Sequence, residues 1–395
     1  MTIEAGHVPV TLGSDAEANR VHLQHLLDAA EGGTLVLPSG TYPLDRGLTV
    51  PAGWTVRGAP AGGTPTTWLT VDTPGDRPVL HVTGGHVAVV DLGLRPAPSR
   101  PGEHDGDRGT GLTVGRYLYS DEPEWIDTIS VRRVHVDHGT NRAANAVAIM
   151  GAVRDVKVRD VTVTGGHTGM AVHWGAVGAG VDTITGPSYH PHRLDLTGVR
   201  VRDAVEGFYL SAVHDVAVDG ACLRGVDMGF RLLAGDNTDR FHSDPATRIG
   251  ERIDIRDVCI TWTGPLYGIR VAGWGRSEVD GLVSHLTYAD TTLRDIVLRR
   301  PPATSVPTPA LTGAAPTGVP TPARVATTAP TGTPTGGPTT DSTGVTPPTP
   351  TGTPAPAATG AAKRGWSPLL MEYADAVTLT GVRIEPPMTP CCPLG

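Results

Sequence analysis

The stretch VKVRDVTV at residues 156–163 decides the fold of this 395-residue chain. It has the form hydrophobic-x-hydrophobic, two turn residues, hydrophobic-x-hydrophobic, so alternate side chains point to opposite faces on both sides of a bend. The same form recurs as VAVVDLGL (87–94), ISVRRVHV (129–136), LDLTGVRV (194–201), VAVDGACL (216–223), IDIRDVCI (253–260) and VTLTGVRI (377–384). Such self-similarity predicts stacked repeats.

The spacing of the repeats is that of one solenoid turn. Leu194 and Val216 are 22 residues apart, whereas the steps from Val156 to Leu194 and from Val216 to Ile253 are 38 and 37 residues. The longer steps indicate one coil plus a loop of about 15 residues. A single coil cannot bury its apolar face, but each neighbour covers the next. We therefore predict an all-β, single-domain, right-handed parallel β-helix.

The N-terminal region predicts a cover for the first coil. Ser14 and Glu17 have the spacing of a capping box, Gly32-Gly33 forms the stop, and residues 14–31 are expected to form a short capping α-helix. The next segment, GGTLVLPSGTYPLDRGLTVPAGWTVRGAP (32–60), alternates short β runs with Pro and Gly turns. It resembles the opening coil of the pectate-lyase-like superfamily, which implies a fold but no particular reaction.

Composition divides the chain. Residues 1–300 are assigned to the β-helix, and residues 301–362, built from Pro, Thr, Ala, Gly, Ser and Val, to a disordered internal loop. Because the repeat resumes afterwards, residues 363–388 are expected to form a final coil and residues 389–395 a flexible tail.

Charge and termini exclude several classes of partner. A net charge of -8, with Lys157 and Lys363 as the two lysines, argues against a general nucleic-acid or anionic-membrane binder. The N-terminus MTIEAGHVPV lacks the basic and apolar regions of a signal peptide. We predict a cytoplasmic protein, with secretion by an unrecognised route as the alternative. The sequence does not determine the oligomeric state.

A second set of short strands precedes each repeat by nine residues, at Val147–Met150 and its equivalents. Alignment of these strands produces two outward columns of side chains about 4.8 Å apart from coil to coil. One column is Ala171, Tyr209, Arg231, Arg270 and Leu370, and the other is His173, Ser211, Leu233, Ala272 and Glu372.

The columns and the neighbouring loops contain groups suited to a sugar chain or an anionic glycan, because aromatic faces stack on sugar rings and planar donors bind hydroxyls and carboxylates. We predict four catalytic residues, His173, Asp236, Tyr209 and Arg231, and seven substrate-binding residues, Trp174, Tyr189, His190, His192, Ser211, Arg270 and Glu372. An ordinary solvated β-face is the alternative.

Other chemistries have weaker signals. Glu206, Asp227 and Glu372 are further candidate acids or bases, and Asp236 is preferred because it lies at the mouth of a loop. No Cys or carboxylate joins the histidines at a ligand spacing, so neither a metal nor a cofactor is expected, with Ca²⁺ as a weakly supported alternative. Cys222 and Cys259 occupy the same position in consecutive coils and are expected to be free thiols in a reducing compartment.

The leading hypothesis is a carbohydrate-active protein that cleaves or rearranges a glycosidic substrate, as a glycoside hydrolase, a polysaccharide-lyase-like enzyme or a transglycosylase. The motifs of polygalacturonase-like hydrolases are represented only by GHTG (166–169) and GIR (268–270), and the acidic cluster of pectate lyases is missing. Two alternatives are an intracellular isomerase or cyclase acting on a non-sugar metabolite, and a non-catalytic glycan-binding or structural solenoid.

Overall fold

The computed structural model describes residues 7–59, 62–73, 78–98, 109–178, 184–234, 250–264, 267–273, 275–279, 282–286, 288–300, 368–372 and 377–385. The chain divides into two units, Met1–Pro302 with Trp366–Gly395, and Ala303–Gly365. The predicted disordered loop at 301–362 lies entirely outside the described residues, and so does the predicted tail at 389–395. Both assignments stay predictions.

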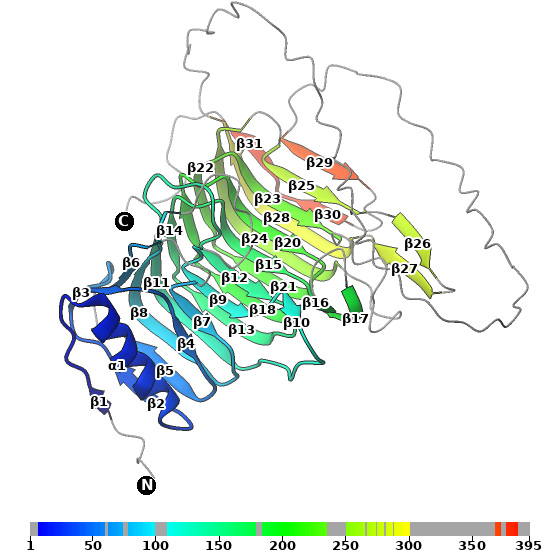
Figure 1. Cartoon of the computed structure of the whole chain (residues 1–395). Helices are drawn as coiled ribbons and strands as arrows, with labels where there is room; N and C mark the ends of the chain where they lie inside the picture. Colours follow the sequence, from blue (N-terminus) through cyan, green and yellow to red (C-terminus); the bar gives the residue numbers. More distant parts are fainter. Residues whose placement is uncertain are drawn as a thin grey trace, which may run out of the picture. The chain divides into compact units, whose positions relative to one another are not determined.

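The first unit is a right-handed parallel β-helix, as predicted (Figure 1). A nine-stranded parallel sheet collects one strand from each coil. Its strands, starting at the N-terminal end, are β4 (Leu48–Val50), β7 (Leu80–Val82), β9 (Leu112–Gly115), β12 (Val147–Met150), β15 (Thr168–His173), β20 (Glu206–Ser211), β23 (Met228–Leu233), β25 (Ile269–Ala272) and β29 (Leu369–Glu372).

A 17-stranded sheet contains the repeats that decided the fold. Its strands are β1 (His7–Pro9), β2 (Gly33–Val36), β3 (Gly40–Leu44), β5 (Trp54–Arg57), β6 (Thr67–Val71), β8 (Ala88–Arg95), β11 (Ile129–Asp137), β13 (Arg154–Arg159), β14 (Thr162–Thr164), β18 (His192–Thr197), β19 (Arg200–Arg202), β21 (His214–Asp219), β22 (Cys222–Val226), β24 (Glu251–Trp262), β28 (Ala289–Arg299), β30 (Val377–Thr380) and β31 (Arg383–Glu385). The coil at β28 was not among the predicted repeats, because Thr291 stands where the others have Val, Ile or Leu.

The bend inside each repeat has one backbone conformation. Asp160, Asp257 and Asp295 lie in the left-handed region with φ of 54°, 53° and 52°, and Gly198 and Gly220 occupy the equivalent position with φ of 67° and 66°. This region suits Gly and, among other residues, Asp and Asn. The Arg-Asp, Thr-Gly and Asp-Gly pairs of the sequence are therefore the turns that stack from coil to coil.

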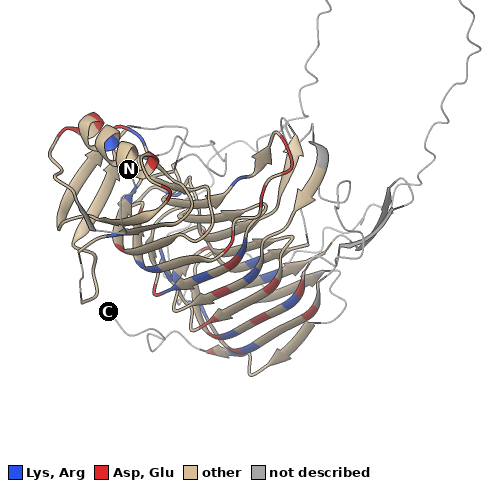
Figure 2. Ribbon diagram, turned by 90° about the horizontal axis from the view of Figure 1, so that it is seen from below, with Lys and Arg blue, Asp and Glu red and all other residues tan. Residues whose placement is uncertain are grey.

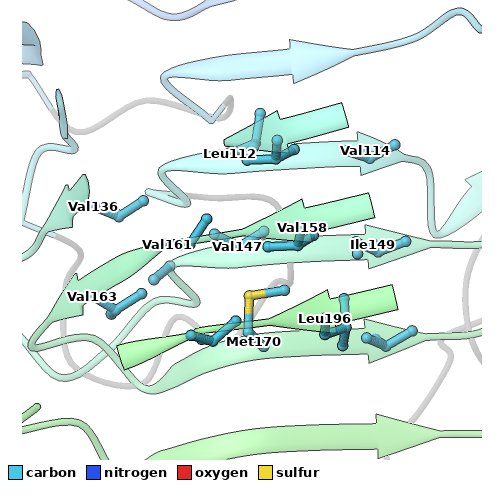
Figure 3. Close-up of a cluster of buried hydrophobic side chains, with 14 of the residues drawn as sticks. Leu112, Val114, Val136, Val147, Ile149, Val158, Val161, Val163, Met170 and Leu196 are labelled. Atoms are coloured by element: carbon cyan, nitrogen blue, oxygen red, sulfur yellow. The ribbon is translucent and has the colours of Figure 1, made fainter. Parts of the chain in front are cut away.

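Inward side chains of both sheets form one continuous core. Figure 3 shows part of it, where Val147 and Ile149 of β12 lie between Leu112 and Val114 of β9 and Met170 of β15. All five are fully buried. This stacking fixes the register of the nine-stranded sheet, because a shift of one residue would expose a whole strand of apolar side chains.

The predicted capping helix is present but shorter than expected. Helix α1 spans Ala16–Asp28, Asp15 rather than Ser14 is its N-cap, and the carboxylate of Asp15 accepts a hydrogen bond from the Ala18 amide. The helix ends at Asp28, with Ala29 rather than the glycines as its C-cap. Leu23 and Leu27 of α1 are fully buried in the core, so the helix covers the N-terminal end of the solenoid (Figure 1).

Strand β16 (Gly175–Gly178) forms an antiparallel pair with β17 (Ile184–Tyr189), and β10 (Leu118–Tyr119) extends this pair. A second hairpin joins β26 (Gly275–Val279) to β27 (Leu282–Leu286). Within the described part of the chain, no helix has the length and apolar character needed to cross a membrane.

The cysteines correct one prediction. Cys222 and Cys259 are in-register partners on neighbouring coils, as expected, but they form a disulfide rather than free thiols. Neighbouring parallel strands lie about 4.8 Å apart, which is within the range of Cα separations that a disulfide spans. The register that aligns the two residues is thus sufficient to bring their sulfur atoms into bonding distance.

Candidate functional site

The structure confirms the predicted register of the first column of outward residues. Ala171 pairs with Tyr209, Tyr209 with Arg231, Arg231 with Arg270, and Arg270 with Leu370 along the nine-stranded sheet. Tyr209, Arg231 and Arg270 therefore share one face on three consecutive coils.

Tyr209 lies between a cation and an imidazole. The guanidinium carbon of Arg231 is 4.0 Å from the centroid of the Tyr209 ring, and the His173 ring centroid is 5.6 Å from it. A guanidinium over an aromatic face is attracted by the ring quadrupole. His173 also contacts Tyr117, with ring centroids 5.0 Å apart, so aromatic contacts on both sides hold the imidazole in place.

A buried carboxyl group completes this cluster. Glu206 begins β20, and its Oε1 lies 3.0 Å from Nε of Arg231, while Thr168 Oγ1 donates a hydrogen bond of 3.2 Å to Oε2. Only 8% of the Glu206 side chain is exposed. Burial raises the pKa of this carboxyl, although Arg231, Thr168 and Arg270 act in the opposite direction.

The residues of this cluster differ in exposure: Glu206 and Tyr209 are buried, whereas the rim, formed by His173, Arg231 and Arg270, is half-buried. Tyr209, Leu233 and Ala272 form a small buried apolar cluster on the outer side of the sheet. His173, Arg231 and Arg270 are half-buried and keep some contact with solvent. A ligand at this face would therefore meet the imidazole and the two guanidinium groups first, with Glu206 and Tyr209 beneath them.

Three residues predicted to bind substrate are buried. Trp174 is fully buried within the main core, and Ser211 is fully buried. His190 is 6% exposed, and its ring nitrogens contact the Ala212 carbonyl at 3.0 Å and Ser188 Oγ at 3.3 Å. Their proposed roles in binding stay predictions, but none of the three is exposed, because sequence alternation assigns a direction to a side chain and does not reveal what covers it.

Two further predicted residues lie in a separate aromatic cluster. Tyr189 contacts Trp125, with ring centroids 5.9 Å apart. His192 belongs to β18 of the 17-stranded sheet, where its ring stacks on His214 at 4.7 Å and 9° and meets Trp125 at 5.0 Å. His192 lies on a strand of the 17-stranded sheet, so the prediction that it lies beside Tyr209 and Arg231 is wrong, whereas the proposed role of Tyr189 stays a prediction. The position of His192 two residues before Leu194 already assigns it to the strand of a repeat.

The last predicted residues are placed only in part. Asp236 lies outside the described residues. Glu372 pairs through its backbone with Ala272 at the end of the nine-stranded sheet, which agrees with the predicted second column. Asp227, another candidate acid, is occupied in a turn, where Oδ2 lies 3.0 Å from Arg142 Nη2 and Oδ1 accepts a hydrogen bond of 3.3 Å from Thr263.

No group of three or more His, Cys, Asp or Glu side chains suited to a metal ion occurs in the portion of the chain described here. The chemistry that the described cluster offers is proton transfer by a carboxyl group and binding by cationic and aromatic side chains.

Glu206 is the functional candidate that sequence reasoning ranked too low. It immediately precedes Gly207, whose added Cβ would point into the core against Leu223, so Glu206 itself points outward. The pairing of Thr168 with Glu206 and of Glu206 with Met228 forms a third outward position at the start of each strand. A carboxyl group one coil before Arg231 and two coils before Arg270 was the signal available in the sequence.

No family model and no curated protein matches the sequence. Among solved structures, an iota-carrageenase of family GH82 from A. fortis covers 73% of this chain and 69% of its own, with 12% identity and a TM-score of 0.44. The A-module of a mannuronan C-5 epimerase from Azotobacter vinelandii covers 73% and 91%, with 16% identity and a TM-score of 0.30. A surface adhesin of Streptococcus pneumoniae covers 73% and 84%, with 9% identity and a TM-score of 0.39. These three proteins are a carrageenase, an epimerase and an adhesin, so the likeness concerns the fold alone.

Proposed function

We propose that this protein is a carbohydrate-active enzyme that cleaves or rearranges a glycosidic substrate on the outer face of the nine-stranded sheet. The observation that carries the proposal is the buried carboxyl of Glu206, held by Arg231 and Thr168 beneath a rim of half-exposed His173, Arg231 and Arg270. The finer reaction type, whether hydrolysis, elimination or transglycosylation, is part of what the experiment below decides.

Glu206 is the proposed proton donor and acceptor. A carboxyl whose pKa is raised by burial retains its proton closer to neutral pH, which is what protonation of a glycosidic oxygen requires. Arg231 stabilises the carboxylate that remains after the proton has left, because its Nε lies 3.0 Å from Oε1. The rate should therefore fall as the pH rises through the raised pKa of Glu206.

His173, Tyr209, Arg231 and Arg270 are the proposed substrate-facing groups. Arg231 and Arg270 lie on adjacent coils and present planar donors to hydroxyl or carboxylate oxygens, while the His173 imidazole supplies a second group that exchanges protons. Tyr209 orients Arg231 and His173 through its ring contacts. Asp236 stays a candidate second carboxyl group for this site.

A non-catalytic glycan-binding or structural solenoid is the second candidate. The burial of Tyr209, Leu233 and Ala272 on the outer side of the sheet favours it, because a covered face leaves less room for a polysaccharide. Under this second function the arginines would bind a glycan and the protein would turn over none.

The deciding experiment screens diverse glycans for new reducing ends and for unsaturated products, with the wild-type protein and the variant Glu206→Gln. We expect Glu206→Gln to lower kcat about 10²–10⁴-fold with little change in KM, because the amide cannot transfer the proton. New reducing ends without an unsaturated product would assign hydrolysis, and both together would assign elimination. Products longer than the substrate without a net gain of reducing ends would assign transglycosylation.

The matched control is Glu251→Gln, the same substitution at a carboxylate of the 17-stranded sheet that pairs with Arg252. It should retain wild-type activity. Turnover of no glycan by the wild-type protein, or equal activity of Glu206→Gln and the wild type, would remove the enzymatic proposal. Binding without turnover would favour the second candidate.

A further inference from the structure

The two ends of the solenoid differ in how they are covered. At the N-terminal end, Leu23 and Leu27 of α1 are fully buried and the helix closes the stack (Figure 1). At the other end, the last described coil consists of β29, β30 and β31, and each of these strands has a β-sheet partner on one side among the described residues.

Three core-type side chains are exposed on that last coil. Met371, Leu379 and Ile384 are 36%, 43% and 59% exposed. Their in-register partners on the preceding coil of each sheet are Val271, Leu293 and Leu298, which are 0%, 0% and 1% exposed. The three residues therefore have the inward direction of the core, and no described strand forms the next layer that would bury them.

An exposed apolar cross-section at the end of a stack of strands is an interaction surface, because its side chains gain from being covered. Proline-rich parts of this chain are poorly suited to that task. Pro386 and Pro387 directly follow β31, and residues 301–362 are rich in proline. Proline has no N–H to donate to a strand edge.

The sequence of β31 is complementary to itself. It reads Arg383-Ile384-Glu385, so antiparallel pairing of two copies about Ile384 sets Arg383 of one copy opposite Glu385 of the other. The Arg383 side chain is 66% exposed and its Nε lies 3.8 Å from Glu385 Oε1 within one chain. The same pairing sets Ile384 against Ile384 at the centre of the contact.

We propose that the end of the solenoid formed by Met371, Leu379 and Ile384 binds the same end of a second copy of this chain, with the two β31 strands antiparallel. The dimer is closed by a two-fold axis. Because α1 covers the opposite end, the copies cannot stack head to tail into a filament.

The test measures the mass of the full chain in solution by sedimentation velocity over a range of concentrations. The wild-type protein should be a dimer that dissociates on dilution. Ile384→Asp should be monomeric, because it places two carboxylates at the centre of an apolar contact. Val21→Asp, at a residue of α1 that is 49% exposed, is the matched control and should remain dimeric.

A second variant keeps the proposal testable if Ile384→Asp fails to fold. Arg383→Glu sets Glu opposite Glu at both ends of the paired strands and should weaken the dimer about tenfold at low salt. High salt screens this repulsion and should restore the dimer. A monomeric wild type, a dimer that Val21→Asp disrupts as strongly as Ile384→Asp does, or an unaffected Arg383→Glu at low salt would each overturn the proposal.

Discussion

Both outer faces of the solenoid contain pairs of an arginine and an acidic residue, but these pairs differ in their exposure to solvent. On the 17-stranded sheet, arginines and aspartates of neighbouring coils form solvated ion pairs, which Figure 2 shows as basic and acidic segments on successive strands. Arg252 and Asp215 are 49% and 32% exposed there. On the nine-stranded sheet, Arg231 and Glu206 are 27% and 8% exposed.

The pKa values of the two carboxyl groups record this difference. The hydrogen bond from Arg252 lowers the pKa of Asp215 despite partial burial, whereas burial raises the pKa of Glu206 despite Arg231 beside it. The direction of the pKa shift depends on access to solvent, because a solvent-accessible carboxylate loses little of its hydration when it forms an ion pair. Access to solvent thus separates the exposed pair of Arg252 and Asp215 from the covered pair of Arg231 and Glu206.

The largest loss of stability should follow removal of the disulfide on the 17-stranded sheet. Cys222 and Cys259 are 37 positions apart, and closing a loop of this size stabilises a protein by about 3–4 kcal/mol. Replacement of both by Ser should lower the free energy of unfolding by that amount, measured in urea without reductant.

An unchanged unfolding midpoint, or two free thiols at these positions by mass spectrometry after alkylation, would contradict the disulfide. Because disulfides persist in oxidising compartments, the state of this pair in protein taken from its own cells also tests the prediction of a cytoplasmic protein.

The next largest loss of stability should follow removal of Arg231 from its ion pair with Glu206. Arg231→Met leaves the Glu206 carboxyl buried without its cation, at a cost of about 3 kcal/mol at pH 8. Since the pKa of Glu206 is raised, its ionisation destabilises the fold as the pH rises, and the stability deficit of the variant should shrink from pH 8 toward pH 5 as the carboxyl takes up protons. Unfolding curves at both pH values measure this, and a deficit independent of pH would contradict it.

A buried histidine beside the nine-stranded sheet should produce a pH dependence of the opposite sign. His138 is 7% exposed, and burial lowers its pKa to about 4. The unfolded chain takes up this proton near pH 6.5 and the folded chain does not, so stability is present above pH 6.5 and falls toward pH 4. Between pH 7 and 5 the loss should be about 2 kcal/mol. His138→Gln should remove this component, and an identical pH profile for the variant and the wild type would refute it.

The smallest effect is expected for the matched change on the exposed face. Arg252→Met leaves Asp215 in contact with water, so it should lower stability by about 0–1 kcal/mol. If Arg252→Met were as costly as Arg231→Met in the same urea series, the contrast between the two faces would be lost.

The sequence alone predicted which residues are neighbours along the solenoid axis. The repeat spacing placed Tyr209, Arg231 and Arg270 on consecutive coils, and it aligned Cys222 with Cys259. These relations follow from a period of two along each strand and a nearly constant coil length, which are both written locally in the chain.

Tertiary structure decided what lies above each outward side chain. Trp174, His190 and Ser211 had suitable chemistry in the sequence but are covered, and Glu206 gained its raised pKa from burial beside Arg231. It also decided that the Cys222 and Cys259 sulfur atoms are bonded and that Ile384 is exposed. Alternation specifies the side of a strand, whereas exposure depends on segments that are distant in sequence, and a pKa depends on that exposure.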